Sequence, residues 1–509
     1  MTQTIASEKG AIASASSDRP PDESPGALGT SGMRDSENVP LVVDLDGTLL
    51  KTDLLHESIL RIARHRPLAL FSVLSSLFRG RAALKQRVAE LAVINASTLP
   101  FNNELLAWLR EEKQHRRKLT LATAANQQQA AQVVKELNLF DAVLGSSTEI
   151  NLKGRAKLAV VRERCGTVFD YVGNSAADLE VWKASRQAIV VGGQKKIERK
   201  ARDCAHVVRT FPAAKENIGV LTRVLRVYQW SKNVLIFVPS FTSHSWLNPS
   251  ILLHCLVAFV AFNFAASATY IANDLLDLEE DRLSSVKRHR ALAAGECTIR
   301  TGVILCAFCF LVAFGIGAVA GTKLFSMLVL YTCGTLLYSF RLKTLLVLDV
   351  LTLAMLYTLR IIVGHVVTGI TFSMWLLSFS FFLFLSLALC KRAAELVRHE
   401  REGQTGVPGR GYLVGDLRVI SAAGIASGFL SCLVLALYIN SSSVTLLYRR
   451  PVLLWGVLPL LLFYLLRIWI ICERGELDAD PIIYTAESKV TYCIAGVVLL
   501  LVALATVRF

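Results

Sequence analysis

The stretch Asn273–Glu296 reads N-D-L-L-D-L-E-E-D-R-L-S-S-V-K-R-H-R-A-L-A-A-G-E, and it decides the fold expected for the second half of the chain. It lies between two apolar runs, Ile251–Ala272 and Ile299–Ala320. Each run has about the 20 residues that a helix needs to cross a bilayer. We therefore expect a charged loop at the mouth of two membrane-spanning helices.

The acidic side chains of this loop keep a helical spacing. Asp274, Asp277 and Asp281 are expected to converge, because residues three and four apart share one face of a helix. Several carboxylate oxygens on one face suit Mg²⁺, which prefers oxygen ligands and often bridges to substrate phosphates. A solvated, charged cytoplasmic loop is the alternative explanation. The expected metal ligands are Asn273, Asp274, Asp277 and Asp281, of which Asp274 and Asp277 are also catalytic candidates, and the basic residues expected to hold phosphate are Lys287, Arg288 and Arg290.

Composition divides the chain into a soluble part and a membrane part. Of its 509 residues, 53% are hydrophobic, and the apolar runs are concentrated after about Arg226. The formal net charge is +15, but no nucleic-acid-binding motif is present, so we do not expect a nucleic-acid partner. Much of the basic excess lies in loops between apolar runs, as the positive-inside rule describes. The 11 cysteines are mostly within apolar runs and are expected to be small buried side chains rather than disulfides.

The apolar runs predict an all-α bundle of about nine membrane-spanning helices. Basic loops follow the even-numbered runs, so the positive-inside rule places these loops on the cytoplasmic side of a bacterial-type inner membrane. The N-terminus is then cytoplasmic and the C-terminus is outside. The predicted spans are Val234–Trp246, Ile251–Ala272, Ile299–Ala320, Leu324–Phe340, Leu348–Thr368, Met374–Leu389, Val419–Ile439, Val452–Ile471 and Tyr492–Val507.

The N-terminal part carries a second pattern. Residues 1–38 are rich in Ser, Ala, Gly and Pro and are expected to form a disordered tail. The next segment, Val39–Leu50, is an apolar strand that runs into D-x-D-G-T. A carboxylate at a strand end can attack phosphorus, and a second carboxylate two residues later can act as acid and base. The segment resembles the first motif of the haloacid dehalogenase (HAD) superfamily of phosphatases, which implies that Asp44 is the nucleophile, Asp46 the acid/base, and both ligands of Mg²⁺.

The resemblance extends to later positions. Thr123, which ends L-T-L-A-T, fits the phosphate-binding position of the family, and Lys157 fits its lysine, with Lys153 as the rival. In D-Y-V-G-N-S-A-A-D-L, Asp178 fits a Mg²⁺ ligand. The sequence departs from the family at Asn174, where an acid is usual, and an amide offers an oxygen without a charge.

These motifs imply a chain of two folded parts. Residues 39–212 are expected to form a HAD-like α/β domain with a Rossmann-like sheet, and residues 54–100 its helical cap. Residues 213–232 would be an interfacial linker and residues 233–509 the membrane domain. The basic and aromatic segment at this boundary is either a set of interfacial anchors or part of a phosphate site, and its candidate residues are Arg226, Gln229, Lys232 and Asn233.

From about Arg223 to the end, the chain resembles the UbiA superfamily of intramembrane prenyltransferases. The resemblance rests on the acidic loop, its place after the second run, and the K-R-x-R-x-x-A-A-G continuation. It implies a helical bundle that binds a polyprenyl phosphate or diphosphate, with Mg²⁺ on acids at the cytoplasmic mouth. The sequence departs from the family after the sixth run, where the basic segment Cys390–Leu396 replaces a second Asp-rich motif.

The motifs R-x-x-Q-W-x-K-N, N-D-x-x-D-x-x-x-D and K-R-x-x-E resemble the decaprenyl-phosphate phosphoribosyltransferase branch. That branch implies transfer of 5-phosphoribose from phosphoribosyl pyrophosphate (PRPP) to a polyprenyl phosphate, and the fused HAD-like domain suggests removal of the 5-phosphate afterwards. The alternatives are an aromatic prenyltransferase and a catalytically silent HAD-like module that docks a partner. A homo-oligomer is left open. Further substrate-binding candidates are Tyr338, Lys343, Lys391 and Arg392, and Asp349 adjoins them.

Overall fold

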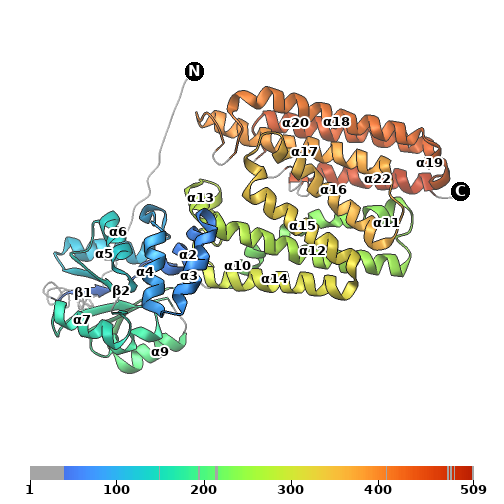
Figure 1. Cartoon of the computed structure of the whole chain (residues 1–509). Helices are drawn as coiled ribbons and strands as arrows, with labels where there is room; N and C mark the ends of the chain where they lie inside the picture. Colours follow the sequence, from blue (N-terminus) through green and yellow to red (C-terminus); the bar gives the residue numbers. More distant parts are fainter. Residues whose placement is uncertain are drawn as a thin grey trace, which may run out of the picture.

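The structure is a computed structural model that describes residues 39–147, 150–192, 195–212, 216–407, 410–477, 481, 484–485 and 488–506. The expected tail, residues 1–38, lies outside the described residues. An α/β domain stands at one end of a long helical bundle (Figure 1). The two expected classes of fold, an α/β domain and an all-α membrane bundle, are therefore both present.

The N-terminal domain is built on a six-stranded parallel sheet with strand order β3-β2-β1-β4-β5-β6. The central strand β1 is apolar at every position because both faces of a parallel sheet are covered. Leu41 and Val43 pack into the core on one face, and Val42 packs into the core on the other. The strands are β1 Leu41–Val43, β2 Leu119–Asn126, β3 Ala142–Ser146, β4 Asp170–Gly173, β5 Ala188–Val191 and β6 Val207–Phe211.

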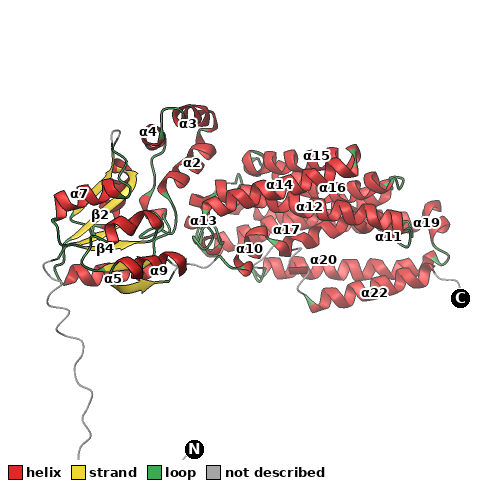
Figure 2. Ribbon diagram, turned by 90° about the horizontal axis from the view of Figure 1, so that it is seen from below, coloured by secondary structure: helices red, strands yellow, loops and turns green. Residues whose placement is uncertain are grey.

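Helices cover the sheet, and three of them form a separate layer that we call the cap (Figure 2). The cap consists of α2 Leu54–His65, α3 Leu70–Leu77 and α4 Arg81–Leu91, all inserted between β1 and β2. Asp53 begins α2 by accepting hydrogen bonds from the first backbone amides of the helix. The remaining helices of the domain are α5 Asn103–Gln114, α6 Gln127–Leu137, α7 Arg155–Cys165, α8 Leu179–Trp182 and α9 Lys195–Cys204.

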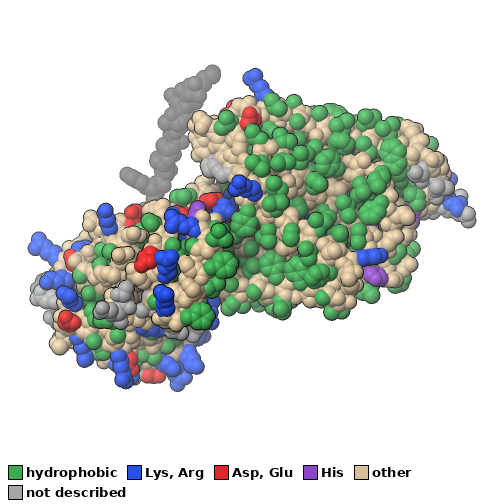
Figure 3. Space-filling view, viewed as in Figure 1, with side chains coloured by type: hydrophobic (Ala, Val, Ile, Leu, Met, Phe, Trp, Pro, Cys, Tyr) green, Lys and Arg blue, Asp and Glu red, His purple; other side chains and the backbone are tan. Residues whose placement is uncertain are grey.

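Among the described residues, eight helices are long and apolar enough to cross a membrane. On the face seen in Figure 3, hydrophobic side chains are spread over these helices. Because lipid cannot satisfy exposed backbone groups, a helical bundle of this kind is one of the two folds that can span a bilayer. The long helices are α12 Pro249–Leu276, α14 Ile299–Ala320, α15 Thr322–Phe340, α16 Leu348–Thr368, α17 Met374–Arg401, α18 Leu417–Ile439, α20 Val457–Glu473 and α22 Lys489–Thr506, and shorter helices are α10 Ile218–Leu225, α11 Val238–Thr242, α13 Leu278–Leu283 and α19 Ser442–Leu447.

The first expected span, Val234–Trp246, is not one of these long helices. The chain there forms a 3₁₀ helix, η4 Val227–Phe237, followed by α11. A 3₁₀ helix rises about 2.0 Å per residue and an α-helix about 1.5 Å, so the two together extend about 30 Å. In Figures 1 and 2, α10 and α11 lie at opposite ends of the bundle. The short segment thus runs the length of the bundle because most of it is wound more tightly than an α-helix.

The cap joins the domain to the bundle. Helix α2 packs against α12 and α14, and ion pairs cross the junction. Arg61 pairs with Glu279, and Arg282 of α13 lies 2.7 Å from Glu57 of α2. These contacts place the α/β domain over the loop that follows α12, so the acidic stretch lies between the two halves of the chain.

Candidate active sites

The acidic stretch forms the mouth of the bundle. Asp274 lies in the last turn of α12, Asp277 directly follows that helix, and Asp281 belongs to α13. All three side chains are buried. Arg290 Nη1 lies 3.0 Å from Asp274 Oδ1 and 2.6 Å from Asp281 Oδ2. The expected convergence is therefore present for these two acids, which share one guanidinium group.

Each acid at the mouth faces more than one base. Asp274 also pairs with Arg226, and Lys287 lies 3.9 Å from Asp281. Lys343 Nζ lies 3.0 Å from Asp277 Oδ2. Most members of this charge cluster are therefore residues that the sequence motifs contain. Arg288 is exposed, and Asn273 is half-buried on α12.

One base at the mouth comes from the N-terminal domain. Arg64 Nη2, near the end of α2, lies 3.1 Å from Asp277 Oδ1. No motif in the sequence identified this residue. The helical spacing of α2 explains why Arg64 lies at the mouth. Arg61 and Arg64 are three residues apart, so they share one face of α2, and both pair with acids of α13.

Burial changes the proton affinities at the mouth. It raises the pKa of Asp281, an effect that Asp274 reinforces and Arg290 opposes. Burial also lowers the pKa of Lys287. Both shifts disfavour the charged form in a partly desolvated site. A phosphorylated ligand that brings its own charges to this mouth would meet groups that are incompletely solvated.

A divalent cation has suitable donors here, but they are not arranged around one point. Within the part of the chain that the structure describes, no group of three or more His, Cys, Asp and Glu is placed to hold a metal ion. The acids face bases instead. Asp277 Oδ1 is buried and accepts no hydrogen bond of good geometry, but Arg64 lies 3.1 Å from it, so a hard cation would reach this oxygen only by displacing that guanidinium. The donor chemistry therefore fits Mg²⁺ once the ion pairs are rearranged.

A second charge network lies behind the mouth, where the sequence departs from the Asp-rich pattern. Arg392 is fully buried, 2.8 Å from Asp349, and it also pairs with Glu395. Arg410 lies 3.2 Å from Asp349 and 3.3 Å from Glu395. Tyr338 donates a 2.7 Å hydrogen bond to Asp349. No role was expected for Glu395 or Arg410 from the sequence, although Glu395 lies in the basic segment Cys390–Leu396.

This network changes how Arg392 is interpreted. A residue that is 0% exposed and held between two acids is not open to a substrate phosphate in this arrangement. It fixes the end of α17 beside α16 and thereby positions the neighbouring groups. Lys391, the adjacent candidate, is half-buried.

The segment η4 supplies residues at two depths of the bundle. Arg226, at its start, reaches Asp274 at the mouth. Asn233 lies deeper, where its amide accepts a 2.8 Å hydrogen bond from Arg360 and donates a 2.7 Å bond to Asn263. Gln229 is buried and its Oε1 accepts no hydrogen bond from the described residues. The four candidates of this segment therefore do not form a single cluster.

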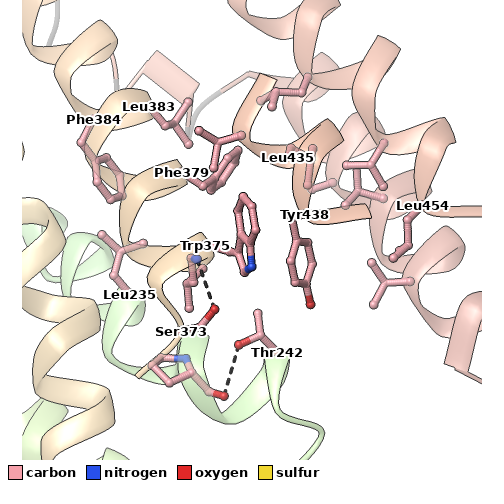
Figure 4. Close-up of a pocket in the computed structure, with 18 of the residues that line it drawn as sticks. Leu235, Thr242, Ser373, Trp375, Phe379, Leu383, Phe384, Leu435, Tyr438 and Leu454 are labelled. Carbon is pink, nitrogen blue, oxygen red and sulfur yellow. Dashed lines mark hydrogen bonds between the residues drawn. The ribbon is translucent and has the colours of Figure 1, made fainter. Parts of the chain in front are cut away.

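A large apolar cavity begins near this segment. Its volume is about 710 Å³, and Lys232 contributes to its wall. Most of the wall is aromatic or aliphatic, including Trp375, Phe379 and Tyr438 (Figure 4). Lys232 Nζ lies 5.5 Å from the centre of the Tyr357 ring. Such a cavity suits a long apolar chain that carries an anionic group at one end.

The sheet of the N-terminal domain carries its own site. Asp44 directly follows β1, and Asp178 follows β4, so both lie at the carboxyl ends of adjacent parallel strands, where such folds bind ligands. Lys157 Nζ lies 2.7 Å from Asp44 Oδ1 and 3.5 Å from Asp178 Oδ1. Lys157, rather than Lys153, is therefore the lysine that pairs with Asp44 and Asp178. Thr123 is fully buried in the neighbouring strand β2.

The two carboxylates of D-x-D-G-T differ in environment. Burial raises the pKa of Asp44 to about 6, against the opposing effect of Lys157. Burial and the nearby Asp53 raise the pKa of Asp46 to about 8. Near neutral pH, Asp44 is the ionised member and Asp46 the protonated one. A nucleophile must be ionised and a general acid must be protonated, so this difference in pKa suits the two expected roles.

Asn174 lies against the turn that bears Asp46. Gly47 has a φ of 72°, and a Cβ atom at Gly47 would lie 2.2 Å from the Asn174 amide nitrogen. Both the backbone conformation and the space therefore require glycine. Asn174 lines a cavity of about 470 Å³ together with Asp44, Asp46, Lys157 and Asp178.

Comparisons with known proteins agree with the membrane half. Residues 235–487 match the family model described as "UbiA prenyltransferase family". Protein y4nM of Sinorhizobium fredii is 38% identical over 463 residues, which are 90% of each chain. Decaprenyl-phosphate phosphoribosyltransferase of Corynebacterium glutamicum is 34% identical over 189 residues, 36% of this chain and 56% of the relative. A solved UbiA homolog from Archaeoglobus fulgidus, bound to GPP and Mg²⁺, is 16% identical with a TM-score of 0.42, over 56% of this chain and 99% of its own.

Proposed function

The membrane half of this chain belongs to the UbiA prenyltransferase family, and from that premise we propose that the protein transfers 5-phosphoribose from PRPP to a polyprenyl phosphate. We propose further that the N-terminal domain is a HAD-type phosphatase that removes the 5-phosphate from the lipid product. The observation that carries the first step is the mouth of the bundle, where buried Asp274, Asp277 and Asp281 each face several bases. The similarity to the phosphoribosyltransferase of C. glutamicum over 189 residues supports the choice of donor.

The mouth has the charges that PRPP requires. PRPP carries a diphosphate at C1 and a monophosphate at C5. Mg²⁺, held by Asn273, Asp274, Asp277 and Asp281, would neutralise the diphosphate. The guanidinium of Arg290 is already shared between two acids, so it can turn to the diphosphate when a metal ion takes its place. Lys343 and Lys287 are placed to bind the remaining phosphate oxygens.

The reaction exchanges one bond at C1 of the ribose. An oxygen of the polyprenyl phosphate forms the new bond to C1, and the bond from C1 to pyrophosphate breaks. Positive charge develops on the sugar while negative charge grows on the leaving group. Bases turned toward the leaving group would stabilise its growing negative charge, and the low polarity of the adjoining cavity would strengthen their effect.

The apolar cavity supports a lipid acceptor. Its volume of about 710 Å³ and its aromatic wall suit isoprene units. Lys232 in that wall would attract the lipid phosphate. Arg226, at the start of η4, would then be the base between the cavity and the acids of the mouth. The acceptor phosphate would then approach the ribose from within the bundle.

The N-terminal domain supports the second step. Asp44 would attack the 5-phosphate phosphorus and form an aspartyl-phosphate. Asp46, protonated near neutral pH, would donate its proton to the ribose oxygen as the P–O bond breaks, and then accept a proton from the water that hydrolyses the intermediate. Thr123 and Lys157 would hold the phosphoryl oxygens, and Mg²⁺ would be held by Asp44, Asp46 and Asp178.

The test uses purified full-length protein in liposomes with Mg²⁺, radiolabelled PRPP and a polyprenyl phosphate. We expect a lipid-linked ribose without phosphate from the unmodified protein, and its phosphorylated form from Asp44→Asn. Asp277→Asn should form neither product. Phosphorylated lipid from both the unmodified protein and Asp44→Asn would refute the phosphatase step. Absence of labelled lipid would refute the transferase, and transfer from a prenyl diphosphate to an aromatic acceptor would then identify the alternative enzyme.

A further inference from the structure

The cap of the N-terminal domain presents an apolar surface to its surroundings. We call this the α3 surface; its members are large hydrophobic side chains on α3 and the residues next to it. More than half of each of these residues is exposed. The exposed fractions are Leu68 81%, Phe71 73%, Leu74 56%, Leu77 51% and Phe78 94%. Soluble domains rarely expose a contiguous cluster of this kind unless it has a partner.

The opposite face of α3 is firmly packed. Val73 is buried against Ile62 of α2 and Val88 of α4. Phe71, Leu74 and Phe78 follow the three- and four-residue spacing of one helical face. The exposed side chains therefore result from the orientation of a packed amphipathic helix, and the cap holds its apolar face outward.

The position of α3 indicates what covers this face. Helix α2, which leads into α3, packs against α12 and α14 and is ion-paired to α13. Figures 1 and 2 both show α3 beside the end of the bundle that carries α10 and α13. That end is where the apolar helices emerge from the bilayer. In Figure 3, hydrophobic side chains of the N-terminal domain lie next to those of the bundle.

Basic side chains flank the apolar face. Arg66 precedes α3 and Arg79 follows it, and both are exposed. An amphipathic helix with bases at its edges matches the interfacial layer of a membrane, where acyl chains meet anionic head groups. Among the residues that the structure describes, neither base forms an ion pair that it would have to leave.

We propose that α3 lies in the membrane interface, with Phe71, Leu74 and Phe78 inserted among the lipids and Arg66 and Arg79 at anionic head groups. The cap is then a membrane-bound element, and the bilayer is the partner that covers the α3 surface.

The same helix borders the phosphatase cavity. Leu77 lines that cavity together with Asp44 and Asp46. The cavity therefore has an apolar wall made by the element that lies in the membrane. On the proposed function, this wall suits a phosphate monoester attached to a lipid, because such a substrate can reach Asp44 while its chain stays in the bilayer.

The test places a photocrosslinking amino acid, p-benzoylphenylalanine, at Phe71 of full-length protein in nanodiscs that contain phosphatidylglycerol. The matched control is Val168, which is 55% exposed and follows the end of α7. Figures 1 and 2 show α7 on the side of the domain away from the bundle. We expect at least about five-fold more lipid adduct from Phe71 than from Val168, since only an inserted helix reaches acyl chains. Equal yields would overturn the proposal, and so would adducts from Phe71 only to protein, which would indicate a second copy on this surface.

A second arm tests the flanking bases. In phosphatidylglycerol nanodiscs, the double variant Arg66→Gln and Arg79→Gln should lower the adduct yield from Phe71, and in pure phosphatidylcholine the variant and the unmodified protein should agree. An unchanged yield in phosphatidylglycerol would remove the electrostatic part of the proposal. Repeating the crosslink in Asp44→Asn protein separates the two proposals, because contact with lipid does not require phosphatase activity.

Discussion

Arg64 of the cap lies 3.1 Å from Asp277 at the mouth of the membrane bundle. Their side chains are 17% and 9% exposed, so this pair between domains is largely removed from water. Asp277 is one of the acids expected to bind Mg²⁺, and Arg64 occupies the oxygen that a metal ion would use. The N-terminal domain therefore supplies a cation to the proposed transferase site.

This pair predicts an altered metal requirement. Arg64→Gln removes a cation that competes with Mg²⁺ for Asp277. The Mg²⁺ concentration at half-maximal transferase activity should fall by roughly two- to five-fold, which corresponds to a net effect of about 0.4–1 kcal/mol for one ion pair. A Mg²⁺ titration of ribosyl transfer measures this. Arg61→Gln is the matched control, because its partner Glu279 is not among the expected metal ligands. The same shift in both variants would mean that domain docking, not competition at Asp277, sets the requirement.

The position of Lys157 predicts which lysine supports dephosphorylation. Its amine is buried between Asp44 and Asp178, whereas Lys153 only borders the cavity. Lys157→Met should lower the phosphatase rate by about 100-fold or more, as loss of a charge-stabilising group does, and Lys153→Met by much less. Release of phosphate from the lipid product measures both rates. Comparable losses would contradict the assignment.

Asn174 predicts a variant with a gain of function. Asn174→Asp adds a carboxylate to a cavity that already contains Asp44, Asp46 and Asp178. Mg²⁺ should bind the N-terminal site about ten-fold more tightly, because metal affinity rises with the charge of the ligand set. Isothermal titration with Mg²⁺ measures this, with Asp277→Asn in the background to remove the site at the mouth. Weaker binding would show that the amide is preferred there.

The buried network behind the mouth predicts graded losses of stability. Asp349→Asn leaves the fully buried Arg392, together with Arg410, on the single carboxylate of Glu395. Arg392→Met leaves Asp349 and the partly exposed Glu395 both paired with Arg410. Removing one partner of a buried pair costs about 3–5 kcal/mol, so Asp349→Asn should lower the melting temperature in detergent by several degrees, and Arg392→Met by less. The exposed Arg288→Gln is the control. Equal melting temperatures would show that the network is solvated.

The raised pKa of Asp46 predicts a dependence of stability on pH. The folded domain keeps the Asp46 proton up to about pH 8, whereas an unfolded chain loses it near pH 4. Its contribution is therefore fully present below pH 4 and is lost as the pH rises through about 8. Pulse proteolysis in urea, with EDTA present, should show this loss in the unmodified protein and a flatter profile in Asp46→Asn. Parallel profiles would contradict the shift.

Local patterns in the sequence predicted much of the architecture. An apolar strand followed by D-x-D-G-T places Asp44 at the end of β1, because that pattern is local and needs no distant partner. The position of Asp274, Asp277 and Asp281 between two apolar runs predicted their place at the mouth, and their spacing predicted the convergence of Asp274 and Asp281. The length of the apolar runs predicted the eight long helices.

Features that depend on distant contacts were not predictable in this way. No periodicity links Arg64 to Asp277, since their pairing depends on how the cap docks on α13. Glu395 and Arg410 belong to different segments that meet only when α17 packs beside the loop before α18. The expected first span failed as an α-helix because hydropathy measures length in residues, and η4 rises farther per residue than an α-helix does.

Helix α2 has a consequence for how the two halves would work together. Asp53 and Leu55, at or near its start, line the cavity that contains Asp44 and Asp46, and Arg64, near its end, reaches the mouth. Eleven residues of α-helix span about 16 Å, so the length of α2 sets the separation between Asp53 at the cavity and Arg64 at the mouth. On the proposed function, a lipid head group released at the mouth would have to move about that distance to reach the cavity of the N-terminal domain, and its lipid chain could stay in the membrane. An insertion of one helical turn in α2 would leave Arg64 on nearly the same face of the helix but move it about 5 Å along the helix axis. Such an insertion therefore tests whether the length of α2 sets the position of Arg64 relative to the mouth.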